Sequence, residues 1–278
     1  MYHYIRNNAN FKALNLNHFR NQLQHLCNKY KIISLKELIK NKSFRNTCVL
    51  TFDDGLKDGL VNALPILEEF NLKATFFIPT KILVTEKLLS VQKRHLILAK
   101  LGAEKFVKEF NKLSEDIFHI ERTGKTNGYD DDLTSNLKWV LDNMDQLKST
   151  IYLNKIFNKY FDEKREFKKI YLTKRDINKL DIAGMEIGVH GHEHLHFANV
   201  SFNEMQSDIL KSVEIFKENF DSKDLVISYP FGSYSLFTLR LCHKLGFMAG
   251  VTTIKKDNTS ADNPLELGRY DCIDNEKF

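Results

Sequence analysis

Short apolar runs alternate with longer amphipathic segments along most of this chain. Five of the runs are rich in β-branched and aromatic residues and are mostly followed by glycine, proline or polar residues, as is typical of buried strands. These predicted strands are Cys48–Phe52, Ala74–Ile78, Met185–Val189, Leu225–Tyr229 and Phe247–Val251. Apolar residues at helical spacing lie between them, at 60–70 and 201–220, so the pattern predicts parallel strands joined by crossover helices.

One long stretch, residues 81–169, breaks this alternation. It is rich in Lys, Asp, Glu and Asn, has helical periodicity in places and contains no strong strand signal. We therefore expect a mainly helical insertion there. An α/β chain of 278 residues commonly forms one domain, so we expect residues 1–278 to be a single domain that carries this insertion.

Composition removes several classes of protein. Hydrophobic residues make up 42% of the chain and only 4 residues are proline, which excludes a disordered protein. The net charge of +5 comes from scattered basic residues without an Arg-rich run, so we expect no nucleic acid partner. The 4 cysteines form no C-x-x-C motif, which argues against a zinc ribbon or a redox pair.

The chain also lacks signals for a membrane. No window approaches about 18 uninterrupted apolar residues, so we expect no transmembrane segment. The first residues lack a charged stretch followed by an apolar run, which predicts a cytoplasmic protein. If the natural chain has a longer N-terminus, the expectation changes to an exported or membrane-peripheral protein. The oligomeric state stays open.

The first candidate for chemistry is a pair of adjacent carboxylates, Asp53 and Asp54, at the end of the first predicted strand. Successive side chains of a strand point to opposite faces, so adjacent acids share a site only where the strand ends and the backbone turns. Gly55 permits such a turn. The alternative is a solvated turn, because Asp and Gly are standard turn formers.

The second candidate is a histidine cluster. Four of the 10 histidines fall between positions 190 and 196, and neutral imidazole is the commonest metal ligand. His190 and His194 are four residues apart and form one possible ligand pair. His192 and His196, with Glu193, form another and match the H-E-x-x-H pattern of zinc proteases, in which the Glu is the general base.

The surrounding sequence favours the first pair. A protease motif needs a helix, whereas Gly191 precedes this one and the next helix start follows at Ser201. His190 instead follows a strand directly, at the end where parallel α/β barrels build their active sites. Together with Asp54, His190 and His194 provide two imidazoles and a carboxylate, which suit Zn²⁺ or another borderline divalent metal such as Co²⁺ or Ni²⁺.

These motifs resemble those of the polysaccharide deacetylases of carbohydrate esterase family 4, which share the nodulation-type deacetylase domain. Residues 51–55 resemble the first motif of that family, 190–194 the second and 229–232 the third. The resemblance covers most of the chain outside 81–169. It implies an α/β fold of the polysaccharide deacetylase type, and fewer than eight β/α units can be counted, so we expect a distorted, incomplete (β/α) barrel.

The resemblance also implies a role for each matched residue. Those roles are Asp53 as catalytic base, Asp54, His190 and His194 as metal ligands, and Tyr229, Pro230 and Phe231 as substrate-binding residues. The backbone N–H of Phe231 would face the oxyanion.

Two positions depart from the family pattern. The third motif usually begins with an Arg that braces the catalytic Asp, where this chain has Ser228, and the late Leu-x-His motif has no His here. A subgroup resembling poly-N-acetylglucosamine deacetylases carries an early Tyr-His pair whose His replaces the late one. Tyr2-His3 matches that pair, so His3 is the candidate acid, and Arg269 is the candidate brace for Asp53. The alternatives are a surface His at the terminus and a structural ion pair.

The predicted function is a metal-dependent hydrolase that removes an N-acetyl or related N-acyl group from an amino sugar. Its substrate would be a glycan, an oligosaccharide or a sugar precursor. Two alternatives stay open. One is a zinc metalloprotease that uses His192, Glu193 and His196. The other is a carbohydrate-binding protein without turnover, suggested by Ser228 and the missing late His, because a fold alone does not establish activity.

Overall fold

The computed structural model describes residues 1–7, 12–114, 131–220 and 224–273. The contacts divide the chain into two compact units. Unit 1 comprises residues 1–86 and 168–278, and unit 2 comprises residues 87–167. Among the described residues, no helix is both long enough and apolar enough to cross a membrane.

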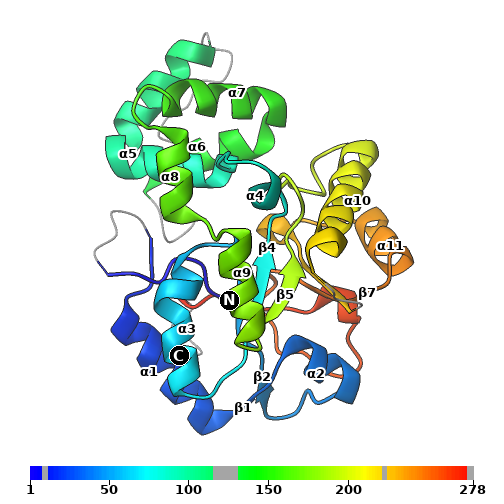
Figure 1. Cartoon of the computed structure of the whole chain (residues 1–278). Helices are drawn as coiled ribbons and strands as arrows, with labels where there is room; N and C mark the ends of the chain where they lie inside the picture. Colours follow the sequence, from blue (N-terminus) through cyan, green and yellow to red (C-terminus); the bar gives the residue numbers. More distant parts are fainter. Residues whose placement is uncertain (8–11, 115–130, 221–223, 274–278) are drawn as a thin grey trace. The chain divides into compact units, whose positions relative to one another are not determined.

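Unit 1 is built on a parallel sheet whose five strands follow one another in chain order (Figure 1). The strands are β3 (Thr51–Phe52), β4 (Thr75–Ile78), β5 (Glu186–Val189), β6 (Leu225–Ser228) and β7 (Phe247–Val251). Nearly all of their side chains are buried, as expected for parallel strands covered on both faces. The sheet curls into a half-barrel, which confirms the predicted distorted, incomplete barrel.

Segments near the two ends of the chain extend the edges of this sheet. Tyr2 pairs in parallel with β3 at one edge, and Leu267 pairs in parallel with β7 at the other. The backbone N–H of Cys272 donates a hydrogen bond of 3.0 Å to the carbonyl of Met1. A backbone hydrogen bond therefore links the two segments that extend the opposite edges of the sheet.

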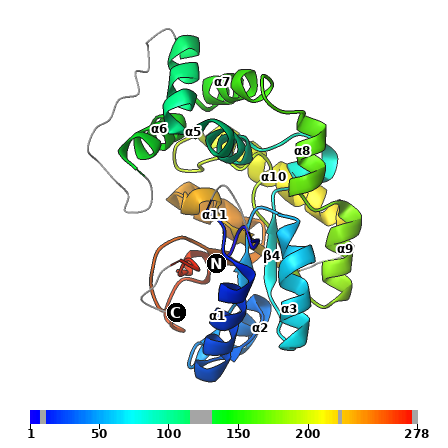
Figure 2. The ribbon, with the colours of Figure 1, turned by 90° about the vertical axis from the view of Figure 1, so that its left-hand side faces the viewer.

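Helices cover the outside of the half-barrel. They are α1 (Leu16–Lys29), α2 (Leu35–Asn41), α3 (Leu64–Glu69), α4 (Lys81–Val84), α9 (Lys174–Ile182), α10 (Phe202–Asn219) and α11 (Leu236–Lys244). Helices α9 and α10 pack against β5, and α11 packs against β7. Figure 2 shows α3 and α9 side by side next to β4. The helix start predicted at Ser201 is confirmed, and Ser201 and Glu204 form a capping box at the start of α10.

Two predicted elements divide in the structure. The first predicted strand becomes β2 (Thr47–Cys48) and β3, because β2 pairs with β1 (Lys31–Ile32) in a separate two-stranded sheet. The helix predicted at 60–70 begins with a π-helical turn, Gly59–Ala63, before α3. Pro65 explains the wider turn, because it has no N–H to bond the carbonyl four residues earlier.

Unit 2 contains helices and no strand among its described residues. Its helices are α5 (Ser90–Ser114), α6 (Asp132–Asn143), α7 (Gln146–Phe157) and most of α8 (Glu163–Ile170). Helices α5, α6 and α7 pack against one another. A buried ammonium, that of Lys93, lies 2.6 Å from Glu163 and 2.6 Å from Asn154, so its charge is paired inside the unit.

One carboxylate joins the sheet to helix α2. Glu186, at the start of β5, accepts hydrogen bonds from the backbone N–H groups of Leu35 and Lys36 at 3.0 and 3.1 Å. It also accepts one from the hydroxyl of Thr75 at 2.7 Å. These N–H groups belong to the first turn of α2, which has no internal partners for them. Glu186 therefore holds α2 against the half-barrel.

We predict that Glu186→Ala lowers the free energy of unfolding by about 1–3 kcal/mol, because three donors lose their acceptor. Chemical denaturation measures this change. Glu68→Ala, which removes an exposed carboxylate of α3, is the control and should have little effect. Equal stability of both variants would contradict this role of Glu186.

Candidate active site

The predicted site residues gather at the carboxyl ends of the parallel strands. Asp53 and Asp54 follow β3, His190 follows β5, and Ser228 ends β6. All four are buried. This edge of the sheet is where parallel barrels place their chemistry.

A tight turn brings the two carboxylates to the same end of β3. Asp54 has a φ of 71° and Gly55 a φ of 63°, both in the left-handed region. A Cβ atom on Gly55 would lie 2.7 Å from Cδ1 of Ile82, so only glycine fits there without displacing that side chain. The turn lets Asp53 and Asp54 take different partners.

Asp54 meets both predicted histidine ligands. Its Oδ1 lies 3.3 Å from Nε2 of His190 and 3.2 Å from Nε2 of His194. Burial alone would raise the pKa of Asp54, but its contacts with the two imidazoles hold it well below its usual range. The carboxylate is therefore ionised and available as a metal ligand at neutral pH.

A backbone carbonyl orients the ring of His190. Nδ1 of His190 lies 2.7 Å from the carbonyl oxygen of Ser228. A carbonyl only accepts, so this nitrogen carries the proton and Nε2 points toward Asp54. His194 has a φ of 61°, and its buried Nδ1 has no hydrogen-bond partner in the described part of the chain.

These three side chains fit a divalent metal ion. One ligand atom each from Asp54, His190 and His194 lie within 4.8 Å of one another, the one such group of three found in the described residues. A carbonyl bonded to the second nitrogen of a histidine is the usual support for a metal-ligating imidazole. Two imidazoles and a carboxylate also leave positions open for water and substrate.

Asp53 has entirely different partners. Its two carboxylate oxygens accept hydrogen bonds from Arg269 at 2.9 and 2.8 Å, and the hydroxyl of Ser228 donates another at 3.0 Å. The remaining Arg269 donors reach Thr252 and Thr51, so this buried guanidinium is held on several sides. Burial would raise the pKa of Asp53, and the charge of Arg269 lowers it below the usual range.

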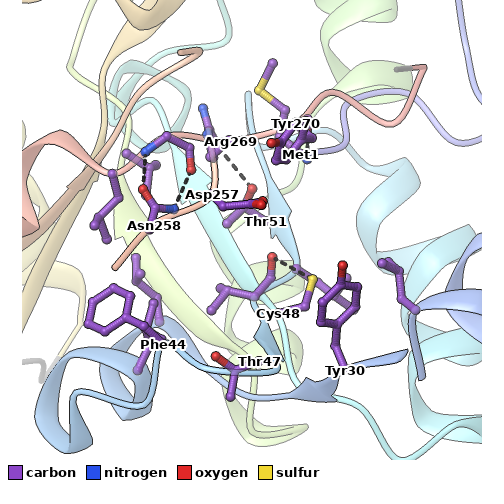
Figure 3. A pocket seen from close by; sticks show the side chains of 18 of the residues that line it. Met1, Tyr30, Phe44, Thr47, Cys48, Thr51, Asp257, Asn258, Arg269 and Tyr270 are labelled. Atoms are coloured by element: carbon purple, nitrogen blue, oxygen red, sulfur yellow. Dashed lines mark hydrogen bonds between the residues drawn. The ribbon is translucent and has the colours of Figure 1, made fainter. Parts of the chain in front are cut away.

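Arg269 also lines a cavity, which Figure 3 shows together with Thr51, Met1 and Tyr30. Its volume is 370 Å³. The two carboxylates and the histidines do not line it. The cavity therefore reaches the guanidinium bonded to Asp53 but is distinct from the group of candidate metal ligands.

His3 faces the same side of the sheet as Asp53. Tyr2 pairs with Phe52, and the two rings stack 5.2 Å apart. Because side chains alternate along a strand, the next residues, His3 and Asp53, point to the opposite side. Burial raises the pKa of Asp53, and the charges of Arg269, of His190 and, least of these, of His3 lower it. His3 is partly buried.

Within the third motif, Phe231 contacts the histidine loop. The side chain of Tyr229 is buried, and its hydroxyl donates to the carbonyl of Leu265 at 2.9 Å. Pro230 is also buried. The ring of Phe231 packs edge-on against His194 at 4.5 Å and stacks on His196 at 3.7 Å.

The metalloprotease alternative is wrong, because residues 192–196 form no helix. His192 bonds the hydroxyl of Thr80 at 3.0 Å, and Glu193 forms an exposed ion pair with Lys81 at 2.5 Å. His196 stacks on the ring of Phe231.

Asp208 is a residue of this region that the sequence patterns did not identify. It lies on α10, is 5% exposed, and accepts hydrogen bonds from the backbone N–H groups of His192 and Glu193. Burial raises the pKa of Asp208 to about 6. The available signal was an acid between Met205 and Ile209, on the buried face of an amphipathic helix.

Comparisons with known proteins agree with this arrangement. The sequence profile described as polysaccharide deacetylase matches residues 40–124 and 127–250, more than half of the chain. The chain therefore belongs to the polysaccharide deacetylase family. A curated relative, YxkH of Bacillus subtilis strain 168, is named as a candidate polysaccharide deacetylase. The match is 32% identical and spans 31% of this chain and 30% of that protein.

Solved structures share the fold along nearly the whole chain. The Streptococcus pyogenes deacetylase PplD, solved with acetate, is 20% identical, with a TM-score of 0.59 over 97% of this chain and 88% of its own. IcaB from Ammonifex degensii is 15% identical, with a TM-score of 0.60 over 96% and 88%. A de-N-acetylase from Aggregatibacter actinomycetemcomitans is 15% identical, with a TM-score of 0.57 over 96% and 91%. At these identities the likeness shows the fold.

We predict that Arg269→Met lowers the free energy of unfolding by about 3–5 kcal/mol, because it leaves the carboxylate of Asp53 buried without its cation. Chemical denaturation measures the loss. The double variant D53N/R269M should be more stable than R269M, since the uncompensated charge is then gone. If the losses of the two single variants simply add, the ion pair is not the cause.

Proposed function

We propose that this deacetylase is a metal-dependent hydrolase that removes the N-acetyl group of an amino sugar in a glycan or glycan precursor. The observation that carries the proposal is the arrangement of two adjacent carboxylates. Asp54 lies against His190 and His194, and Asp53 lies against Arg269. This arrangement supports a cation-binding role for Asp54 and a proton-accepting role for Asp53.

Asp54 Oδ1, His190 Nε2 and His194 Nε2 would hold Zn²⁺, or another divalent metal such as Co²⁺ or Ni²⁺. Such an ion polarises the acyl carbonyl and lowers the pKa of a water molecule toward about 7. The bond from His190 Nδ1 to the carbonyl of Ser228 keeps the ring in the tautomer that leaves Nε2 free for the ion.

Asp53 would act as the general base. Arg269 holds its pKa below the usual range, so the carboxylate is ionised at neutral pH, and both oxygens are fixed in position. It would accept the proton of the attacking water while the acyl carbon becomes tetrahedral. The guanidinium would also stabilise the carboxylate against movement during that step.

His3 would donate the proton to the departing amine. It points to the same side of the sheet as Asp53, and the family's late His is absent from this chain. The backbone N–H of Phe231, next to His194, would donate to the developing oxyanion, and such a donor typically contributes about 3 kcal/mol. The early Tyr-His pair supports a place in the subgroup that resembles poly-N-acetylglucosamine deacetylases.

The non-catalytic alternative rested partly on Ser228, which stands where the family usually has an Arg. In the structure, Ser228 and Arg269 both contact Asp53, and the hydroxyl of Ser228 also accepts from Arg269 at 2.9 Å. The brace on the base is therefore present and comes from a different position in the chain. This observation favours turnover over simple carbohydrate binding.

We predict that Asp54→Ala and His190→Ala lose stoichiometric zinc, because each removes one of three ligands. His196→Ala is the matched control from the same loop and should retain it. Elemental analysis of the purified variants measures the metal directly. Loss of zinc in His196→Ala with retention in His190→Ala would assign the ligands to the alternative pair, His192 and His196.

We predict that Asp53→Asn retains metal but lowers kcat about 10²–10⁴-fold on N-acetylglucosamine oligomers, because an amide cannot accept the proton of water. Amine release measures turnover. A kcat close to that of the wild type would exclude Asp53 as the base.

We predict that His3→Ala lowers kcat on the same oligomers without changing metal content. The loss should shrink for an activated acetate ester, whose leaving group needs no proton. Equal losses on amide and ester would show a structural role, and no loss on either would place the acid elsewhere.

A further inference from the structure

The loop between the two histidine ligands is held on one side by a buried carboxylate. Asp208 accepts hydrogen bonds from two consecutive backbone N–H groups, those of His192 at 2.8 Å and Glu193 at 2.7 Å. Each of its oxygens takes one of them. Asp208 belongs to α10, which packs against β5, so it links the loop to the outer layer of the half-barrel.

The same loop is held on its other side by the end of β4. The N–H of Thr80 donates to the carbonyl of Gly191 at 3.0 Å, and that of Lys81 donates to the carbonyl of His192 at 3.3 Å. The N–H groups of residues 192 and 193 thus donate hydrogen bonds to Asp208 on α10. The carbonyls of residues 191 and 192 accept hydrogen bonds from the segment after β4.

The fit between this loop and Asp208 is close. Gly191 has a φ of 68°, and a Cβ atom there would lie 2.9 Å from Oδ1 of Asp208. His194 directly follows the two clamped N–H groups and itself has a φ of 61°, a conformation that non-glycine residues rarely adopt. A strained ligand position needs surrounding contacts that hold it, and the N–H that Asp208 binds on Glu193 belongs to the residue directly before His194.

We propose that Asp208 is a positioning residue for the metal site: by binding the N–H groups of His192 and Glu193 it fixes the backbone that aims Nε2 of His194 at Asp54. This inference rests on the proposed function, because it assumes that His194 is a metal ligand. Bonds to an ionised acceptor are stronger than neutral ones, so a carboxylate suits this task better than an amide. It touches no substrate and no reacting atom.

The test uses Asp208→Asn, which keeps the side-chain shape but turns one acceptor into a donor facing an N–H group. Ser212→Ala is the matched control, because Ser212 is buried on the same helix and its hydroxyl donates to the carbonyl of Ile209 within that helix. Two quantities are measured at pH 8, where Asp208 is ionised. They are the amide exchange rates of His192 and Glu193 in metal-free protein, by NMR, and the affinity for Co²⁺, by its absorption spectrum.

We expect Asp208→Asn to speed exchange of at least one of the two amides and to weaken Co²⁺ binding about 10- to 100-fold, the usual effect of losing a contact that supports a metal ligand. Ser212→Ala should change neither quantity. Unchanged exchange and affinity in Asp208→Asn would overturn the proposal, as would equal losses in both variants. The exchange rates need no metal and no turnover, so they report on the two hydrogen bonds to Asp208 even if the proposed function fails.

Discussion

The ion pair between Arg269 and Asp53 connects the fold of unit 1 to its chemistry. Asp53 follows β3 at one edge of the sheet, and Arg269 lies beyond Leu267, which pairs with β7 at the other edge. The guanidinium makes two bonds to the carboxylate, and Ser228 reaches both groups from β6. A buried charge is tolerated only when it is paired and fully hydrogen-bonded, so these three segments must come together for the site to exist.

The two neighbouring aspartates show how environment separates roles. Asp53 is paired with a permanent cation that also fixes its orientation, whereas Asp54 faces two imidazoles whose charge depends on protonation or on a metal. A pair of carboxylates in different surroundings is a common basis for dividing work in an active site. The strained turn at Asp54 and Gly55 makes this division possible, because it directs adjacent side chains to different partners.

The parts of the site that the sequence predicted are those determined by local pattern. Asp53, Asp54 and His190 follow strands that periodicity identifies, and parallel strands bring their carboxyl ends together. Arg269 was proposed as a brace in place of the Arg that the family has at position 228, and in the structure it contacts Asp53. The bond from His190 to the carbonyl of Ser228 depends on which strands are neighbours, and no local pattern contains that information.

Other features escaped prediction for physical reasons of the same kind. The strand predicted at 48–52 splits because β2 finds a partner in β1, a contact set by tertiary structure. Asp208 looks like an unfavourable acid on a buried helix face until the N–H groups of the histidine loop are placed beside it. The metalloprotease alternative is excluded because residues 192–196 form no helix. Glycine at 191 and the helix start at Ser201 already indicated this in the sequence.

The central claim is that Asp54, His190 and His194 bind a catalytic metal ion beside Asp53. X-ray diffraction from zinc-loaded crystals, recorded at the zinc absorption edge, tests it most directly. The account predicts one anomalous peak at about 2.0–2.2 Å from one oxygen of Asp54 and from Nε2 of both histidines. No peak at this position in a zinc-loaded crystal, or a peak at His192 and His196 instead, would contradict it.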